Sequence, residues 1–231
     1  GCWVNAIPGN GLVMIPEASA GCVCQFSIAS TVVLEPKTEN KSWGIFSAVG
    51  ETTPVQRIGI NFGAPGDRKD LAHSEWLGFP RPKTVGRLEF VFDIQPQLAS
   101  GGGWYSQNPD SVQVPGAETP WLFASGAKGL QHFEIPLLGD QDKSAAYNVK
   151  LFFAETTVAV ANSVQIRFQG NDAAGTTKVA GNDSGADAQF VVKEFVGVPV
   201  EKNLVVDITV AASMPLTNLA AIEVVRVSEA Q

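Results

Sequence analysis

The sequence predicts an all-β fold in which two antiparallel sheets pack as a sandwich. No window of about 11 residues carries apolar side chains at the i, i+3, i+4, i+7 spacing of an amphipathic helix. Short segments rich in β-branched and aromatic residues recur along the chain instead. Clusters of Gly, Pro, Asn and Asp separate these segments, and the chain holds 23 glycines and 14 prolines. Turn signals at such regular spacing are typical of sandwiches.

The strand-like segments follow one another along the chain. In order, they are residues 25–36, 57–63, 86–96, 130–138, 147–155, 162–170, 188–200, 203–212 and 219–228. The clearest reads YNVKLFFAE, where Tyr147, Val149, Leu151 and Phe153 alternate with other residues and predict one buried face. This strand ends in Glu155, a carboxylate that could be a general acid or base or could fix a corner of the structure.

Two regions depart from this rhythm. Residues 1–46 form a Pro/Gly-rich opening with all the cysteines, so we expect an irregular extension there and a sandwich over residues 47–231. Residues 96–120 carry a Gly triplet and two adjacent aromatic residues and predict a long loop. Loops of this length inside a compact domain are uncommon and often functional.

Composition and charge exclude some functions. Hydrophobic residues make up 45% of the chain, enough for a substantial core. The formal charge is -7 with no run of basic residues, so we expect no nucleic-acid binding. No apolar run approaches the roughly 20 residues that cross a bilayer, so we expect no membrane insertion. No signal peptide is visible at Gly1, and we expect the chain to be a piece of a longer protein.

The cysteines Cys2, Cys22 and Cys24 lie close together in sequence. A zinc site would need four ligands, and His73 and His132 are distant and isolated. A disulfide between Cys2 and either Cys22 or Cys24 fits better, closing a loop of about 20 residues worth roughly 3 kcal/mol. It implies an oxidising compartment, and the third cysteine stays free or pairs with another segment.

Exposed aromatic residues are the strongest candidates for a binding site. Trp104 and Tyr105 follow three glycines, which have no side chains that could bury them. A sugar ring can stack with its C–H face on an exposed aromatic ring. Asp110 is a nearby polar group for the sugar hydroxyls. Trp76 and Trp121 stand at expected strand ends with a similar claim. The alternative is that these rings pack against the sandwich, as a Trp at a strand end often does.

Catalytic and metal signatures are scarce. No nucleophile elbow, phosphate loop or HExxH motif is present, and two histidines give no basis for a Ser-His-Asp triad. A glycosidase needs two carboxylates facing one cleft, which a sequence does not reveal. Asp172, Asp183 and Asp187 lie in a Gly- and Asn-rich stretch that could bind calcium, although the same residues also form ordinary hairpin turns. We therefore expect no catalytic residues, and calcium is the one cofactor that the sequence leaves open.

The order of several segments resembles malectin and malectin-like domains over about residues 55–228. These are RIGINFGAPGD, YNVKLFFAET, NSVQIRFQGND, VVKEFVGVPVEKNLVVDITVAA and LAAIEVVRV. The resemblance implies a jelly-roll sandwich of two sheets that binds carbohydrate through loops at one end. It also implies that Glu155, which matches the family's FAE glutamate, is structural. The family's sugar-binding loops are where this sequence departs most, so their residues do not transfer.

The N-terminal segment carries a second resemblance. Its Gly-Cys start, its IP–GL–P stretch and its Cys-x-Cys resemble the segment after PQQ-like β-propellers in large secreted bacterial proteins. This implies an extracytoplasmic location: periplasm, cell surface or secreted. The leading hypothesis is a non-catalytic carbohydrate-binding module of a larger protein. The alternatives are a structural domain that packs on a propeller or neighbouring subunit, and a fragment of an enzyme.

Overall fold

The computed structural model describes residues 6–17, 30–36, 43–45, 52–81, 93–112, 114–154, 160, 163–180 and 190–228. Its contacts divide the chain into two compact units, Gly1–Ser42 and Trp43–Gln231. Cys2, Cys22, Cys24, Glu155, Asp183 and Asp187 lie outside the described residues, and so does most of the expected strand at 86–96.

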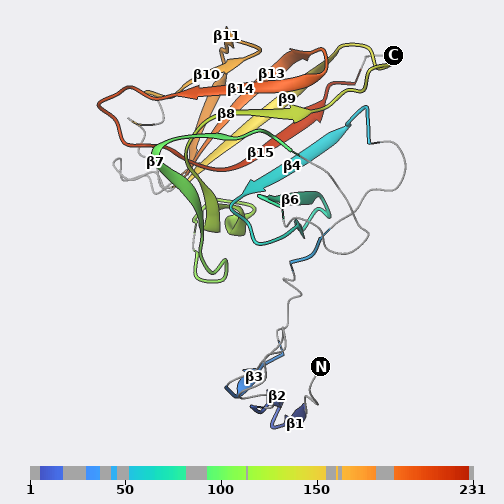
Figure 1. The fold of residues 1–231 in the computed structure, drawn as a ribbon, viewed down its shortest axis with the longest axis vertical. Coiled ribbons are helices and arrows are strands. Elements are labelled where there is room, and N and C mark those ends of the chain that lie inside the picture. Colours follow the sequence, from blue (N-terminus) through green and yellow to red (C-terminus); the bar gives the residue numbers. More distant parts are fainter. Residues whose placement is uncertain are drawn as a thin grey trace. The chain divides into compact units, whose positions relative to one another are not determined.

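Unit 1 contains three short strands, β1 (Ile7–Gly9), β2 (Leu12–Ile15) and β3 (Val32–Leu34). They pair antiparallel in the order β1-β2-β3. The turn between β1 and β2 has positive φ at Asn10 and Gly11, as a tight hairpin requires. The expectation of an irregular extension is therefore wrong for this part, because the apolar IPG and LVMI runs pair as a hairpin (Figure 1).

Within the described part of unit 2, twelve strands form one branched sheet. These strands, together with one 3₁₀ helix, are β4 (Arg57–Phe62), β5 (Arg68–Lys69), β6 (Glu75–Phe79), β7 (Gln97–Ser106), η1 (Pro120–Ala124), β8 (Ser125–Pro136), β9 (Ala145–Ala154), β10 (Gln165–Phe168), β11 (Asn171–Asp172), β12 (Thr176–Ala180), β13 (Phe190–Val200), β14 (Asn203–Thr209) and β15 (Asn218–Arg226). The neighbouring strands of this sheet pair antiparallel, except for β4 with β6, which are parallel.

The branching makes two layers. One layer has the order β5-β6-β4-β15-β9-β13-β12, and the other has the order β11-β10-β14-β8-β7. They join where the start of β15 pairs with β8, Asn218 opposite Lys128. The all-β, two-layer prediction is confirmed. We call the surface of the first layer that faces away from the second its outer face.

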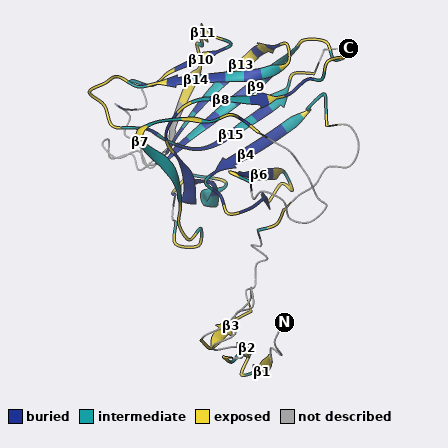
Figure 2. Cartoon of the chain, viewed as in Figure 1, coloured by how far each residue is buried: buried dark blue, intermediate teal, exposed yellow. Residues whose placement is uncertain are grey.

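The core lies between the layers and follows the alternation of the strands. On β9, Tyr147, Val149, Leu151 and Phe153 are at most 1% exposed, while the residues between them are partly exposed. Their partners come from both layers, including Phe62 on β4 and Phe133 on β8. Figure 2 shows the buried residues along the inner strands and the exposed ones on the connections. The alternation of YNVKLFFAE thus predicted its buried face correctly.

The expected loop at 96–120 is wrong in its first half, which is strand β7 paired with β8. The Gly triplet does not loosen the chain there. Gly101 has φ +77°, and the β7–β8 register shifts between Leu98 and Gly103, so the glycines form a bulge inside the strand.

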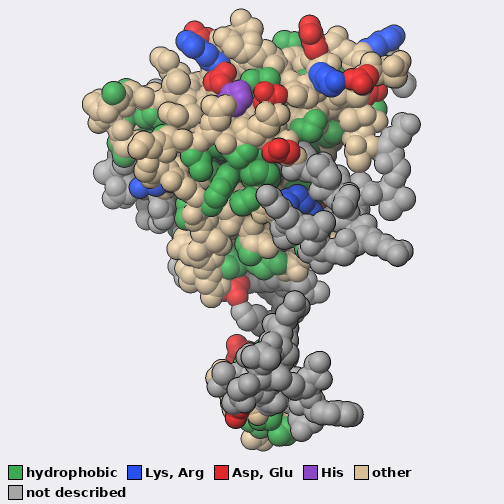
Figure 3. Space-filling model, in the orientation of Figure 1, with side chains coloured by type: hydrophobic (Ala, Val, Ile, Leu, Met, Phe, Trp, Pro, Cys, Tyr) green, Lys and Arg blue, Asp and Glu red, His purple; other side chains and the backbone are tan. Residues whose placement is uncertain are grey.

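Surface charge in unit 2 is dispersed. On the face drawn in Figure 3, Lys and Arg side chains stand singly among acidic ones rather than in a basic patch. The described residues contain no helix that is long and apolar enough to cross a membrane.

Candidate ligand-binding groove

A groove of about 340 Å³ opens on the outer face of the first layer. Its floor consists of outward-pointing residues in two neighbouring rows. In one row, Phe152 on β9 pairs with Val192 on β13. In the next row, Lys150 on β9 lies between Glu194 on β13 and Glu223 on β15. Because alternate residues of a strand share a face, these rows are the outward counterpart of the buried core positions. The floor therefore sets an apolar strip beside a charged strip.

The charged row is held by ion pairs. Lys150 Nζ lies 3.5 Å from Glu194 Oε1 and 3.7 Å from Glu223 Oε2. Arg57 on β4 is paired with Val225 rather than with Glu223, but its side chain reaches this row, with Nε 2.9 Å and Nη2 2.8 Å from Glu223 Oε1. Oppositely charged side chains directly across neighbouring strands support the pairing of those strands. They also fix several polar groups in position along one side of the groove.

One wall of the groove is Trp76 on β6, which is 4% exposed. Its indole lies over Gly59, where a Cβ would come within 2.8 Å of the ring, so only glycine allows this packing. Asp70 accepts a hydrogen bond from Trp76 Nε1 at 3.1 Å, and Arg57 lies 5.2 Å from the ring centroid. The ring also meets Phe152 edge to face at 5.8 Å. Trp76 is thus a fixed wall of the groove rather than an exposed platform.

The other wall is η1 and the segment before it. Phe123 of η1 contacts Phe152 and Phe190, with ring centroids 6.3 and 4.8 Å apart. Asn61, fully buried on β4, donates from Nδ2 to the carbonyls of Leu122 and Ala220, both at 2.9 Å. These bonds tie η1 to the sheet and hold the groove open beside it. Glu118 and Thr119 add polar groups at the rim.

Trp104 and Tyr105 lie on β7, on the other layer, and do not line the groove. The Trp104 ring stacks on Phe62 at 6.3 Å and meets Phe79 edge to face at 5.6 Å. The Tyr105 ring lies over Gly126, where a Cβ would be 2.7 Å from its hydroxyl. Both are partly buried, Trp104 against Phe62 and Phe79 of the first layer and Tyr105 beside Gly126 of β8. Packing, the alternative that the sequence left open, accounts for these positions.

Trp121 and Asp110 belong to a cluster around Arg68. The Arg68 guanidinium lies 4.7 Å from the Trp121 ring centroid and 5.3 Å from that of Trp43. Burial lowers the pKa of Arg68, and the carboxylate of Asp110 opposes that shift. Arginine between two indoles is a stable cation–π arrangement. Of the five aromatic and acidic residues expected from sequence to bind a ligand, Trp76 alone lines the groove.

The calcium candidate Asp172 is exposed on β11 and accepts a hydrogen bond from Arg167 Nε at 2.7 Å. Within the described residues, no group of three or more His, Cys, Asp or Glu side chains is arranged to hold a metal ion. A calcium site that includes Asp183 and Asp187 stays a prediction, because both residues lie outside the described part of the chain.

Sequence reasoning missed Lys150, Phe152, Glu194 and Glu223, the residues that make the floor of the groove. Their signal was present in the strand pattern. A strand on the surface is expected to point polar side chains outward, and Phe152 breaks that rule beside Lys150. An aromatic residue on the outward face of an amphipathic strand indicates that something covers or binds that face.

Comparisons with known proteins give fold-level similarity of limited extent. No protein-family model and no curated protein matches the chain. Among solved structures, a beta-glucuronidase of Bacteroides uniformis is 10% identical, with a TM-score of 0.49 over 99% of this chain and 28% of that one. The ANX2 ectodomain of Arabidopsis thaliana is 15% identical, with a TM-score of 0.44 over 75% of this chain and 43% of that one. The chain spans less than half the length of either protein, and neither similarity assigns a function.

Proposed function

We propose that unit 2 is a non-catalytic carbohydrate-binding module of a larger extracytoplasmic protein, with a jelly-roll, malectin-like fold. The observation that carries this proposal is the two-row floor of the groove, where Phe152 lies beside Lys150, Glu194 and Glu223. A sugar ring offers an apolar C–H face and a rim of hydroxyls. The first suits the aromatic strip, and the second suits fixed carboxylates and an ammonium, since hydrogen bonds to charged groups are the stronger ones.

The charge of the groove selects among sugars. Four carboxylates line it, those of Asp70, Glu118, Glu194 and Glu223, against the single ammonium of Lys150. Acidic sugars would meet net repulsion here. We therefore infer a neutral or amino sugar as the ligand. Stacking of about 1–3 kcal/mol, by analogy with bases on aromatic rings, and a few hydrogen bonds give an affinity of about micromolar to millimolar.

The arrangement favours binding over hydrolysis. Lys150 lies between Glu194 and Glu223, within 4 Å of each. A glycosidase places the scissile bond, and in inverting enzymes a water molecule, between its two carboxyl groups. Here an ammonium takes that place.

A glycan array probed with the whole chain tests the proposal. We expect signals on neutral or amino sugars and none on uronic or sulfated glycans. Lys150→Gln should reduce binding at least tenfold, the loss of about one charge-assisted hydrogen bond. Lys128→Gln is the matched control, since Lys128 is exposed on β8 away from the groove, and it should bind as the parent does. Equal binding by both variants, or a preference for acidic glycans, would remove the groove as the sugar site.

Unit 1 favours a second candidate, a protein-docking role for the N-terminal strands. Its described strands expose Ile7, Val33 and Leu34, each about half accessible to solvent. Apolar exposure on a small sheet is typical of a surface that meets a neighbouring domain. Val33→Lys should then weaken association with that neighbour and leave glycan binding unchanged. The reverse result would count against a docking role.

A further inference from the structure

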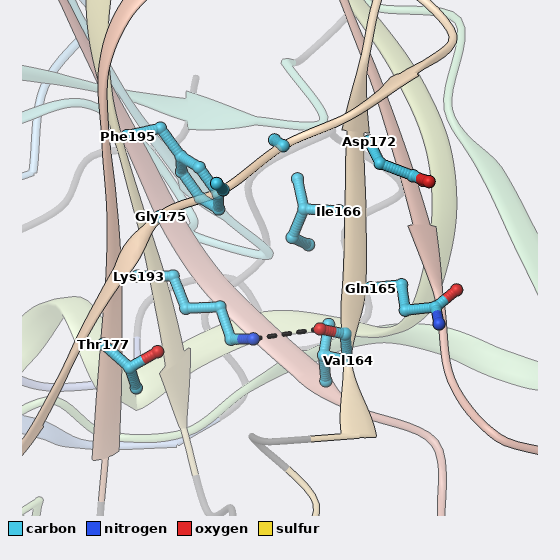
Figure 4. A pocket seen from close by; sticks show the side chains of 10 residues that line it. Val164, Gln165, Ile166, Asp172, Gly175, Thr177, Lys193 and Phe195 are labelled. Atoms are coloured by element: carbon cyan, nitrogen blue, oxygen red, sulfur yellow. Dashed lines mark hydrogen bonds between the residues drawn. The ribbon is translucent and has the colours of Figure 1, made fainter.

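A second cavity, of about 380 Å³, lies on the other side of β13 from the groove. Lys193 and Phe195 point into it from β13, whereas Val192 and Glu194, which alternate with them, line the groove. Figure 4 shows Ile166 and Val164 facing Lys193 across the cavity, with Thr177 beside it. The two sites are therefore separate, and this inference does not depend on the carbohydrate proposal.

Lys193 is a buried cation with few partners. Its side chain is at a core-facing position opposite Leu151 and is 9% exposed. Of its three donors, one bonds the carbonyl of Val164 at 2.9 Å. Burial lowers the pKa of Lys193, and no charged neighbour offsets that effect within the described residues.

The acid that lines the cavity does not serve as a counter-ion for Lys193. Asp172 lines the cavity, but its carboxylate is bonded to Arg167. Figure 4 shows Asp172 and Gln165 turned away from Lys193. Buried charges in proteins are normally paired, because an unpaired ion in a low-dielectric site is costly. The cavity thus holds a positive charge and a space beside it, with no anion of its own in the described chain.

We propose that this cavity binds a small organic carboxylate, held by Lys193 at its charged end and by Ile166 and Phe195 at its apolar end. The carboxylate oxygens accept hydrogen bonds from the Lys193 N–H groups that do not bond the Val164 carbonyl. The Thr177 hydroxyl is a further donor. A single ammonium balances a single negative charge. A dianion such as phosphate would leave uncompensated charge in the cavity and is disfavoured.

Butyrate is the probe, and butanamide is its neutral match in shape. On the whole chain, we expect butyrate at about ten times its Kd to raise the melting temperature by about 3–6 °C over sodium chloride of equal ionic strength. Butanamide and inorganic phosphate should give no comparable rise. Lys193→Met should abolish the butyrate effect, while Lys128→Met, which changes an exposed lysine on β8, should keep it.

A direct measurement covers the case in which Lys193→Met fails to fold. In the parent protein, the ¹³Cε resonance of Lys193 should move on titration with butyrate and stay in place with butanamide, while that of Lys128 should not move. A stationary Lys193 resonance, or a melting-temperature rise that butanamide equals, would overturn the proposal. Stabilisation by phosphate that matches that of butyrate would overturn the choice of a carboxylate.

Discussion

Asp67, just before β5, is tied to β6 and to the residues that follow it through a backbone hydrogen bond and a buried ion pair. It is 1% exposed and receives Nη1 and Nη2 of Arg81 at 2.6 and 2.9 Å and the backbone N–H of Gly78 at 2.8 Å. Paired guanidinium and carboxylate groups of this kind give geometric specificity as well as energy. Asp67 is the acid of the RIGINFGAPGD segment, where it makes these structural contacts.

Asp67→Asn should lower the free energy of unfolding by about 3–5 kcal/mol, because the buried Arg81 guanidinium would lose the negative charge that faces it. Asp140→Asn is the matched control. Asp140 is exposed and pairs at the surface with Lys202, whose hydrogen bond and charge lower the pKa of Asp140. Pairs of that kind contribute little, so the control should unfold near the parent's urea midpoint. Similar losses of unfolding free energy in both variants would show that the buried Asp67 pair stabilises the fold no more than a surface pair does.

Because of Lys193, the free energy of unfolding of unit 2 should depend on pH in the alkaline range. Its folded-state pKa lies below its ordinary value of 10.5, because burial disfavours the ammonium. Below the folded-state pKa, Lys193 is protonated in both the folded and the unfolded state, so folding carries the full free-energy cost of burying the ammonium. As pH rises from there toward about 10.5, the folded state releases the proton first and the cost disappears. Lys193 therefore destabilises the fold at neutral pH and does so less as the solution becomes alkaline.

Lys193→Met removes this titration. The parent should therefore gain free energy of unfolding relative to the variant when the pH rises from about 7 to about 9.5. The lost hydrogen bond to Val164 costs about 1 kcal/mol at either pH and cancels from the comparison. Tyr147, whose pKa burial raises, titrates in both proteins. Urea unfolding at the two pH values measures the difference. A constant difference would mean that Lys193 is solvated in the folded state.

At the scale of elements, strands with regular alternation could be read from the sequence, and strands built on glycine could not. The expected segments at 57–63, 147–155 and 219–228 correspond to β4, β9 and β15, whose apolar residues mark the core face. Strand β7 was missed because the three glycines in its middle have no side chains to alternate. The groove was missed because its residues come from β6, β9, β13, β15 and the η1 region, and only the folded sheet brings these together.

The glycines of β7 differ in what they require. A Cβ at Gly102 would lie 2.6 Å from the Lys128 carbonyl oxygen, whereas one at Gly103 would meet nothing within 4 Å. Gly102→Ala should therefore displace β7 from β8 and cost about 1–3 kcal/mol. Gly103→Ala should be tolerated, since it also restricts the unfolded chain. Hydrogen exchange of the β7 and β8 amides measures the pairing. Equal protection in both variants would contradict the close approach at Gly102.

At the scale of the whole molecule, the buried core clusters of the described residues all lie between Ile58 and Val224, inside unit 2. The boundary expected from sequence was after residue 46, whereas the contacts place Trp43 and Gly44 with unit 2. The reason is local: Gly44 exchanges two backbone hydrogen bonds with Asp67, at 2.7 and 2.8 Å, and Trp43 meets Trp121 edge to face at 5.7 Å.

Two truncated chains distinguish a start of unit 2 at residue 43 from a start after residue 46. A chain of residues 43–231 should melt within a few degrees of the same transition in the full chain, because it loses no described residue of unit 2. A chain of residues 47–231 gives up the Gly44 bonds, the Trp43 contact with Trp121 and one face of Arg68. Two hydrogen bonds of about 1 kcal/mol each and an aromatic pair of about 0.5–1.5 kcal/mol predict a loss of roughly 2–4 kcal/mol. Calorimetry of the two chains should therefore show a lower melting temperature for the shorter one. Equal melting temperatures would place the start of the unit after residue 46, as the sequence pattern alone indicated.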